Sequence, residues 1–252
     1  MAGWAWPALV VHRCGGALAP ENTLAGLEIA ARLGCQAVEF DVMLSADGQP
    51  VLIHDETLDR TAGRPGHVAE LGAAELAGVD VGSHFHPAYA GEAIPAFGAA
   101  LERCRSLRLA ANVEIKPAAG KERQTGQVVG RCLRAIDAGA DGPQVLLSSF
   151  SVEALEAAIA EVPHLSRALL VGSYSPAALA MARKLSCVAL NLSREGLTAA
   201  DVDAVREAKL AVMVYTVNAF DEARRLLDWG VAGVFSDRPD LLLPLATECC
   251  IT

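Results

Sequence analysis

Residues 37–54 read Ala-Val-Glu-Phe-Asp-Val-Met-Leu-Ser-Ala-Asp-Gly-Gln-Pro-Val-Leu-Ile-His, and this stretch decides the fold. Two apolar runs, 37–42 and 51–54, flank Asp47-Gly48, a dipeptide typical of a tight β-hairpin turn. The second run therefore returns antiparallel to the first. If the turn has two residues, paired positions sum to 95, and Asp41 lies opposite His54 on the same face. A different loop length would turn His54 away.

Strand-like runs recur along the chain, with helical runs between them. Short, apolar and mostly β-branched segments occupy nine stretches: 9–13, 37–42, 51–54, 109–115, 145–149, 168–171, 187–192, 211–217 and 233–236. Such segments are typical of strands buried on both faces. Nine is one more than an eight-stranded barrel contains, and the antiparallel hairpin strand accounts for the surplus. The sequence therefore predicts an α/β fold of the (β/α)8 TIM-barrel type.

The helical runs carry end signals. They cover residues 24–33, 96–107, 126–138, 152–161, 176–184, 199–208 and 221–229. Ser151 and Thr198 are suited to N-caps, and Gly34, Gly139 and Gly230 are suited to end helices. Strands alternating with helices indicate a parallel sheet. No G-x-G-x-x-G follows the first strand, which disfavours an open dinucleotide-binding fold.

Residues 55–95 do not follow the alternation, because they are interrupted by glycines and prolines. We interpret the chain, residues 1–252, as a single barrel domain with an insertion at about 55–95 after the second strand. The insertion is expected to rise from the top of the barrel, with helix limited to residues 68–77.

Composition and charge restrict the function. The 252 residues are 52% hydrophobic and 20% charged, as in a folded globular protein, and the formal charge of −9 disfavours nucleic-acid binding. A small anionic substrate remains compatible with this charge, since a few cations in a pocket suffice. No stretch is apolar over the roughly 20 residues that span a bilayer. Seven cysteines without a C-x-x-C pair suit a reducing compartment, so a cytoplasmic protein is expected.

Carboxylates recur near the carboxyl ends of two predicted strands, where barrel enzymes place their chemistry. Glu39 and Asp41 share one face of their strand, as do Glu114 and Lys116. Three converging carboxylates repel one another, and a hard divalent cation, Mg²⁺ or Ca²⁺, would resolve this repulsion. Alternatively, one carboxylate pairs with Lys116 or Arg13 and the others are solvated at the rim.

Two histidines accompany the carboxylates. His12 ends the first strand, and His54 is returned to the cluster by the hairpin. They suggest an acid and a base, although each could instead be a hydrogen-bonded histidine at the barrel mouth. Arg13 and Lys116 are the cations available for a phosphate. A metal, two cations and two imidazoles describe phosphoryl transfer better than glycoside hydrolysis, which needs only two carboxyls.

Aromatic and loop residues give weaker signals. Phe150 and Tyr215 follow strands and either wall the pocket or cap the core. His84-Phe-His86 is more typical of polar surface than of a metal site, because no third ligand is near in the sequence.

Ten segments of the chain, in order, carry a family resemblance. They are His12-Arg-Cys-Gly-Gly-Ala-Leu-Ala-Pro20-Glu-Asn-Thr23, Val38-Glu-Phe-Asp-Val42 with Asp47-Gly48, Val51-Leu-Ile-His54-Asp55, Leu58-Asp-Arg-Thr61, Ile94-Pro95, Asn112-Val-Glu-Ile-Lys116, Leu147-Ser-Ser-Phe150, Tyr215-Thr-Val-Asn218, Trp229-Gly-Val and Ser236-Asp237. Together they resemble the glycerophosphodiester phosphodiesterases, and look closest to the small cytoplasmic bacterial branch.

The resemblance implies a barrel with a small insertion, one divalent cation (Mg²⁺ or Ca²⁺), and hydrolysis of glycerophosphodiesters to sn-glycerol 3-phosphate and an alcohol. The matching positions are Glu39, Asp41 and Glu114 as metal ligands, His12 and His54 as acid and base, Arg13 and Lys116 as phosphate contacts, and Phe150 and Tyr215 as pocket walls. Two positions depart from the family pattern. Cys14 stands where glycine is usual, and would be strained if its φ is positive; His84 stands where an aromatic residue is frequent.

Two other functions compete with this one. A lysophospholipase D would need an apolar groove, for which the insertion offers Phe85, Tyr89, Ile94 and Phe97. A non-catalytic phosphate-ester sensor would be expected to lack a histidine or a metal carboxylate, and all five are present. The sequence leaves open the alcohol released, the cation, the oligomeric state, and whether water or the substrate's own 2-hydroxyl attacks phosphorus.

Overall fold

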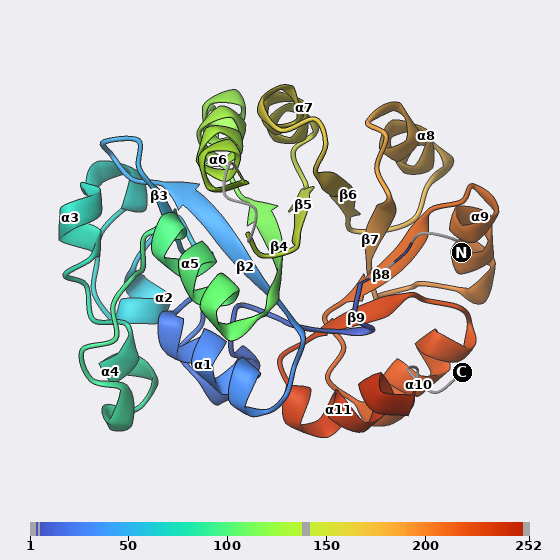
Figure 1. Ribbon diagram of the computed structural model, residues 1–252, viewed down its shortest axis with the longest axis horizontal. Coiled ribbons are helices and arrows are strands. Elements are labelled where there is room, and N and C mark those ends of the chain that lie inside the picture. Colours follow the sequence, from blue (N-terminus) through green and yellow to red (C-terminus); the bar gives the residue numbers. More distant parts are fainter. Residues whose placement is uncertain (1–3, 5, 138–141, 249–252) are drawn as a thin grey trace.

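Eight parallel strands close into a barrel in a computed structural model that describes residue 4, residues 6–137 and residues 142–248. The barrel strands are β1 (Leu9–Val11), β2 (Ala37–Leu44), β4 (Ala110–Ile115), β5 (Val145–Ser149), β6 (Ser166–Val171), β7 (Ala189–Ser193), β8 (Ala211–Tyr215) and β9 (Gly233–Ser236). β1 pairs with both β2 and β9, which closes the ring. The predicted (β/α)8 TIM barrel is confirmed, with helices arranged around the strands (Figure 1).

Eight helices of the described residues surround the barrel, and seven of them follow the predicted runs closely. They are α1 (Leu24–Arg32), α5 (Phe97–Leu107), α6 (Glu122–Asp137), α7 (Val152–Glu161), α8 (Pro176–Lys184), α9 (Ala199–Glu207), α10 (Phe220–Asp228) and α11 (Pro239–Glu248). Ser151 and Thr198 cap their helices as predicted. Gly34 and Gly230 follow helix ends with φ of 85° and 91°, whereas Gly139 lies outside the described residues. The eighth helix, α11, has no counterpart among the predicted runs.

Two apolar layers line the barrel wall, because successive side chains of a strand point to opposite faces. Outward side chains pack against the helices and form the larger core. Inward positions near the strand starts hold small side chains, including Ala37, Ala110, Ala168, Ala189 and Ala211. These alanines pack with larger side chains, among them Trp6, Leu146 and Phe235, so the polar side chains nearer the strand ends stand above an apolar base.

The hairpin register differs by one residue from the prediction. β3 (Pro50–Leu52) runs antiparallel to β2, with Val42 opposite Leu52 and Leu44 opposite Pro50, so paired positions sum to 94. The loop has three residues, 46–48, closed by the Ser45 amide donating to the Gln49 carbonyl at 3.0 Å. Its last residue, Gly48, takes a φ of 74°, as three-residue hairpin loops require. The predicted pairing of Asp41 with His54 is therefore wrong.

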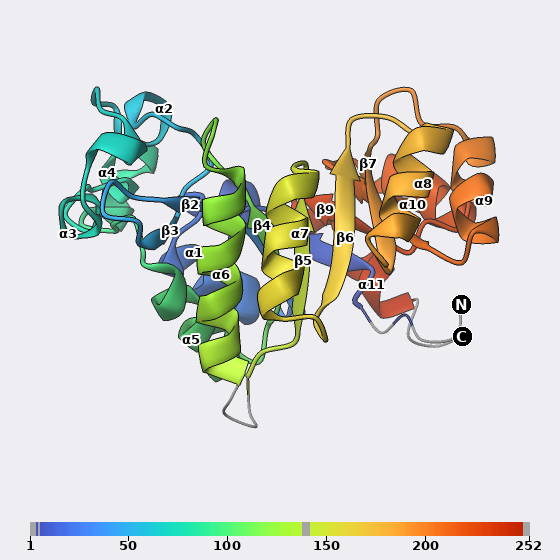
Figure 2. The ribbon, with the colours of Figure 1, turned by 90° about the horizontal axis from the view of Figure 1, so that it is seen from above.

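The segment between β3 and α5 contains more helix than the predicted residues 68–77. It forms α2 (Asp59–Ala62), α3 (Ala73–Leu76), α4 (Gly82–Phe85) and two 3₁₀ turns, Val68–Glu70 and Pro87–Tyr89. Single-turn helices are too short to show helical periodicity, so the sequence missed them. The segment packs on the hairpin through its own apolar cluster, which includes Met43, Ile53, Leu58 and Leu76. It stands at one end of the molecule (Figure 2).

Five cysteines in the described residues, Cys14, Cys35, Cys104, Cys132 and Cys187, are free thiols, and Cys249 and Cys250 lie outside that part of the chain. Within the same residues, every helix is too short or too polar to cross a bilayer.

Candidate active site

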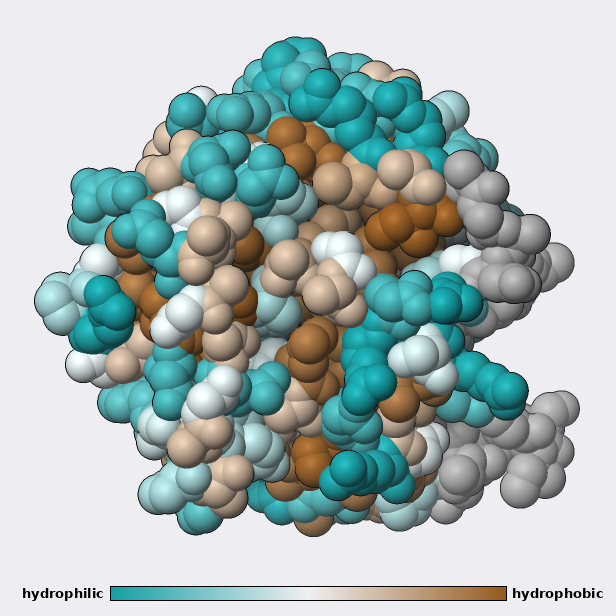
Figure 3. All heavy atoms as spheres, turned by 60° about the vertical axis from the view of Figure 1, so that its left-hand side comes forward, coloured by the Kyte–Doolittle hydropathy of each residue, from teal (hydrophilic) through white to brown (hydrophobic). Residues whose placement is uncertain are grey.

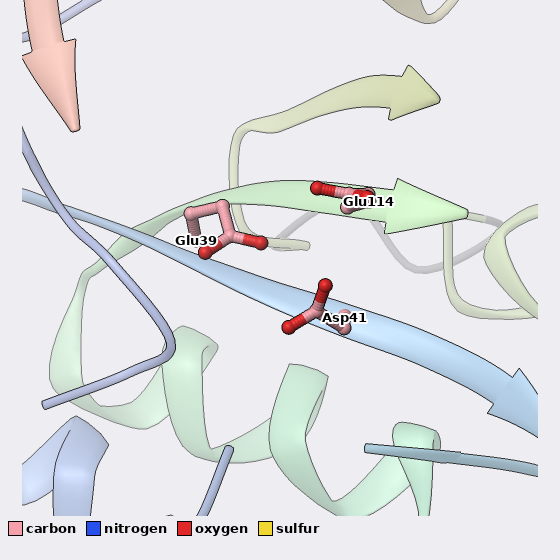
Figure 4. Close-up of side chains that lie close together, drawn as sticks. All are labelled: Glu39, Asp41 and Glu114. Carbon is pink, nitrogen blue, oxygen red and sulfur yellow. The ribbon is translucent and has the colours of Figure 1, made fainter. Parts of the chain in front are cut away.

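Three carboxylates converge inside the barrel. Glu39 and Asp41 come from β2 and Glu114 from β4, and the side chains approach one another in Figure 4. One oxygen from each lies within 4.8 Å of the others. The parallel register of β2 and β4 pairs Asp41 with Glu114, so strand alternation and register together bring the predicted cluster into one place.

The carboxylates raise one another's pKa. Burial, and then the charge of Asp41, raise the pKa of Glu114 to about 8. Burial, with Asp41 and Glu114, also raises the pKa of Glu39 well above its ordinary value. Burial acts in the same direction on Asp41, but Lys116, His54 and Arg13 outweigh it and lower the pKa of Asp41. Without a further positive charge, the cluster thus favours the protonated forms of Glu114 and Glu39 more than water does.

The donor set fits a hard divalent cation. All three side chains offer carboxylate oxygens, which Mg²⁺ and Ca²⁺ prefer. Glu39 Oε1 is buried and has no hydrogen-bond partner among the described residues, while its Oε2 accepts from the Arg13 amide at 2.9 Å. A buried carboxylate oxygen without a partner is unfavourable unless a ligand supplies one. Glu39, Asp41 and Glu114 could therefore hold a metal ion.

His12 is oriented by the last barrel strand. Its Nδ1 lies 2.7 Å from Asp237 Oδ1, and Asp237 in turn accepts from Asn218 Nδ2 at 3.1 Å. The His12 amide donates to the Ser236 carbonyl at 2.9 Å, so the closure between β1 and β9 fixes the residue. The opposite ring nitrogen, Nε2, lies 3.9 Å from Glu39 Oε2. A carboxylate that is hydrogen-bonded to one ring nitrogen sets the tautomer of the imidazole. The other ring nitrogen is then free to accept or donate a proton.

His54 has an equivalent partner and a longer network. Its Nδ1 lies 2.5 Å from Asp55 Oδ1, and Asp55 Oδ2 accepts from Arg60 Nε at 2.6 Å. Arg60 also binds both Glu21 oxygens, at 2.6 and 2.8 Å, and Glu21 accepts from Arg13 at 3.2 Å. Arg60, on α2 of the insertion, thereby links the supports of His54 and Arg13. His54 reaches the site because it lies beyond the end of β3, where the ladder no longer dictates its direction.

Arg13 and Lys116 lie beside the carboxylate cluster. Arg13 Nε is 3.9 Å from Asp41 Oδ2, and Lys116 Nζ is 3.6 Å from Asp41 Oδ1. One alternative from the sequence was that a carboxylate pairs with Arg13 or Lys116. Both side chains lie within 3.9 Å of Asp41, and their charges also favour ionised Glu114. The turn that delivers Arg13 is tight: Cys14, which follows it, has a φ of 71°, so the expected conformational strain is present.

Asn22 holds Asp41 in place with a reciprocal pair of hydrogen bonds. Asn22 Nδ2 donates to Asp41 Oδ2 at 2.9 Å, and the Asp41 amide donates to Asn22 Oδ1 at 3.0 Å. Asn22 is buried and has a φ of 57°, which asparagine tolerates better than most residues. It locks the loop after β1 to the strand that carries two of the three carboxylates.

Two adjacent cavities lie at the carboxyl ends of the strands. An inner cavity of about 200 Å³ is lined by His12, Arg13, Glu39, Asp41, His54, Asn112, Glu114, Lys116, Phe150, Leu170, Asn191, Tyr215, Thr216 and Phe235. All nine predicted site residues are among them. An outer cavity of about 970 Å³ shares His12, Arg13 and Thr216 with it, and extends to Arg60 and the insertion.

The two aromatic residues stand at the mouth of the inner cavity. Phe150 and Tyr215 meet edge to face with ring centroids 6.0 Å apart. Phe150 is 54% exposed, so it walls the opening and does not cap a core. The Tyr215 hydroxyl donates to the Val171 carbonyl at 2.9 Å, and burial raises the pKa of Tyr215 to about 12.

The carboxylates that support the histidines, Asp55 and Asp237, are not among the residues predicted from the sequence to form the site. Asp55 directly follows His54, and Asp237 directly follows the last strand, which were the available signals. Glu21 and Arg60 lie within the family-like segments 12–23 and 58–61, but the sequence alone does not show what they contact. Asn191 was not considered.

Among the other predicted residues of the insertion, His84 and Phe85 line the outer cavity but not the inner one. His84 and His86 are exposed, and His86 Nδ1 accepts from the Ala88 amide, as expected for polar surface. Ile94 and Phe97 are buried, so they do not contribute to an apolar groove. On the face seen in Figure 3, hydrophobic residues lie in separate patches among polar ones.

Comparison with known proteins agrees with this geometry. The glycerophosphoryl diester phosphodiesterase family matches residues 12–241. A glycerophosphodiester phosphodiesterase of Caldanaerobacter subterraneus subsp. tengcongensis is 29% identical over 240 residues, covering 95% of this chain and 98% of the relative.

Two solved structures are similar over nearly their whole length. An Oleispira antarctica phosphodiesterase in complex with the product sn-glycerol 3-phosphate has a TM-score of 0.90 and 33% identity, covering 96% of this chain and 97% of that one. An Agrobacterium tumefaciens glycerophosphodiester phosphodiesterase has a TM-score of 0.76 and 28% identity, covering 94% and 99%. The chain therefore belongs to the glycerophosphoryl diester phosphodiesterase family and is a phosphodiester hydrolase.

Proposed function

We propose that this protein hydrolyses glycerophosphodiesters to sn-glycerol 3-phosphate and an alcohol, with one divalent cation, Mg²⁺ or Ca²⁺, and two histidines as acid and base. The observation that carries the proposal is the inner cavity, where three carboxylates, two cationic side chains and two carboxylate-supported imidazoles line one small space. The product complex of the Oleispira antarctica relative gives the same product class.

The charged residues of the cavity have two roles in this proposal, metal binding and phosphate binding. Glu39, Asp41 and Glu114 hold the cation, which when bound neutralises and polarises the phosphodiester. Arg13 and Lys116 contact the phosphate oxygens, Arg13 with a planar guanidinium suited to two oxygens at once.

The histidines move the protons, and the aromatic residues enclose the site. One of His12 and His54 takes a proton from the nucleophile and the other gives one to the leaving alkoxide, each steadied by its carboxylate. Phe150 and Tyr215 wall the mouth of the cavity. Enclosure limits the access of bulk water and strengthens the electrostatic contacts inside.

The primary experiment measures release of sn-glycerol 3-phosphate from glycerophosphocholine and glycerophosphoethanolamine. Mg²⁺ or Ca²⁺ is added, EDTA serves as the metal-free control, and His12→Ala is compared with the wild type. We expect cation-dependent release that falls by about 10²- to 10⁴-fold in the variant. Equal release in EDTA would contradict the metal requirement, and equal release by folded His12→Ala would contradict its catalytic role.

The nucleophile is water or the substrate's own 2-hydroxyl, and a quenched time course distinguishes them. Attack by the 2-hydroxyl produces a cyclic glycerol phosphate before the final product. Absence of this species at all times, with ¹⁸O from water incorporated in a single step, would establish direct attack.

Three further expectations from the sequence belong to this proposal. The described barrel acts as one phosphodiesterase domain, with residues 55–95 as an insertion at its mouth. The substrate is a small glycerophosphodiester and not a nucleic acid, in line with the charge of −9. The free thiols are compatible with a reducing, cytoplasmic location.

A further inference from the structure

One polar side chain in the inner cavity takes no part in the networks described above. Asn191, on β7, is fully buried, and neither Oδ1 nor Nδ2 has a hydrogen-bond partner among the described residues. Buried amide groups are almost always paired, because leaving one unpaired is unfavourable. Asn191 lines the inner cavity, so a molecule bound there can supply the partners.

The neighbouring strands cannot supply them. At the level of Asn191, the register pairs it with Leu170 on β6 and Met213 on β8, both apolar. Ala189, two residues before Asn191 on the same face of β7, is buried in the apolar base of the barrel. The amide is thus the polar group of an otherwise apolar wall.

This wall faces the acidic cluster. Around the closed barrel the strands follow the order β1, β2, β4, β5, β6, β7, β8 and β9. β7 is four strands away from β2 in either direction, so Asn191 stands across the barrel from Glu39 and Asp41. Arg13 and Lys116 lie beside Asp41. A molecule with one end on these two side chains directs its other end toward β7.

We propose that Asn191 binds the terminal hydroxyl of the glycerol moiety and makes the site selective for glycerol-bearing diesters. The inference rests on the proposed function, in which Arg13 and Lys116 contact the phosphate. A carboxamide both accepts and donates hydrogen bonds, as a hydroxyl does, so Asn191 can pair with the terminal hydroxyl in either direction. A substrate with a methyl group in place of the terminal hydroxyl leaves the buried amide unpaired, and the site disfavours it.

The test compares two substrates that release the same alcohol. Glycerophosphocholine carries both hydroxyls, and 2-hydroxypropyl phosphocholine lacks only the terminal one, so the 2-hydroxyl remains available as a nucleophile. Choline release gives kcat/KM for both. We expect the wild type to prefer glycerophosphocholine by roughly 100-fold. Asn191→Leu should lower kcat/KM for glycerophosphocholine by a similar factor and leave the analogue unchanged.

Stability provides a second readout. Leucine has a similar volume and removes the unpaired amide, so Asn191→Leu should have a Tm equal to or above that of the wild type. A lower Tm with parallel loss of both activities would mean that Asn191 supports the barrel wall. Asn191→Ala repeats the comparison with a smaller side chain in case leucine is not accommodated.

Leu170→Met, on the adjacent strand, is the control for cavity shape and should affect both substrates equally.

Two results would overturn the inference: an equal loss of kcat/KM for both substrates in Asn191→Leu, or no loss for either. If the wild type releases choline from neither substrate, the proposed function fails, and calorimetry then decides the inference. Weaker binding of sn-glycerol 3-phosphate to Asn191→Leu than to the wild type would support it, and equal affinity would overturn it.

Discussion

Asn22 shows how one side chain determines the position of a metal ligand. It combines two hydrogen bonds to Asp41 with a left-handed backbone. Asn22→Ala removes both bonds, leaves the buried Asp41 amide unpaired, and places a Cβ-bearing residue at positive φ without a side-chain bond to compensate. We expect the free energy of unfolding to fall by about 2–4 kcal/mol, measured by urea denaturation.

The matched control for this change is Asn22→Gly. Glycine loses the same two hydrogen bonds but adopts positive φ without penalty, so it should be less destabilising than alanine by about 1 kcal/mol. If the alanine variant is as stable as the wild type, the reciprocal bonds do not hold Asp41.

At the residue scale the sequence could predict which groups meet, but not what supports them. The shared face of Glu39 and Asp41 follows from strand alternation, which is a local rule, and the predicted barrel brings Glu114 toward them because the carboxyl ends of its parallel strands meet at one end. The contact of His12 with Asp237 depends on ring closure between the first and last strands, 225 positions apart, and no local pattern encodes it. Asn191 is unpaired partly because its register partners on β6 and β8, Leu170 and Met213, are apolar, and a local pattern around Asn191 does not reveal them.

At the scale of elements, the short helix α2 connects the insertion to the site through Arg60. Arg60→Met breaks the link from Asp55 to Glu21 and so releases both His54 and Arg13. Because small displacements of reacting groups are costly, we expect kcat to fall by about 10- to 100-fold in the phosphodiesterase assay. Arg60→Lys keeps the charge without the planar fork and should recover only part of the loss.

Arg134→Met on α6 is the control, because Arg134 also pairs with a carboxylate, Glu161 at 2.7 Å, but on the outside of the barrel. Its kcat should match the wild type. Similar Tm values for the two methionine variants would assign the effect of Arg60 to positioning. An unchanged kcat in Arg60→Met would show that the network is dispensable.

The elements themselves differ in how far the sequence reveals them. Barrel strands and most outer helices are long enough for apolar patterns to identify them, and those predictions are confirmed, whereas α11 was not predicted. The hairpin was recognised from Asp47-Gly48, but this dipeptide fits a two-residue turn as well as the end of a three-residue loop, which changes the register by one. The insertion is organised by contacts with the hairpin and not by periodicity within its own turns.

At the scale of the whole molecule, the buried carboxylates couple stability to pH. The pKa of Glu114 is about 8 in the folded protein and near 4.5 in an unfolded chain. The pKa of Glu39 is shifted in the same direction. Between these limits the folded protein binds more protons than the unfolded chain, so stability falls as pH rises through this window. The lowered pKa of Asp41 acts only at more acidic pH.

In EDTA, we therefore expect a lower Tm at about pH 8 than at about pH 5.5. Mg²⁺ or Ca²⁺ should remove this difference, since a bound cation stabilises the ionised carboxylates and selectively binds the folded state. Glu114→Gln, which cannot ionise, should weaken the pH dependence in EDTA. A metal-free Tm that is independent of pH over this range would contradict the coupling.

The closed ring leaves β3 as the strand of the described sheet that pairs with a single neighbouring strand. Such edges invite pairing with another molecule. Here the chain covers its own edge: the Leu52 amide donates to the Pro95 carbonyl at 3.0 Å, and Val51 forms a bridge with Ala96. Both residues lie where the insertion returns to the barrel. The insertion, which carries Arg60, therefore also covers the free edge of β3. Cleavage or detachment of its end at residues 95–96 would expose this edge to pairing with a strand of another molecule.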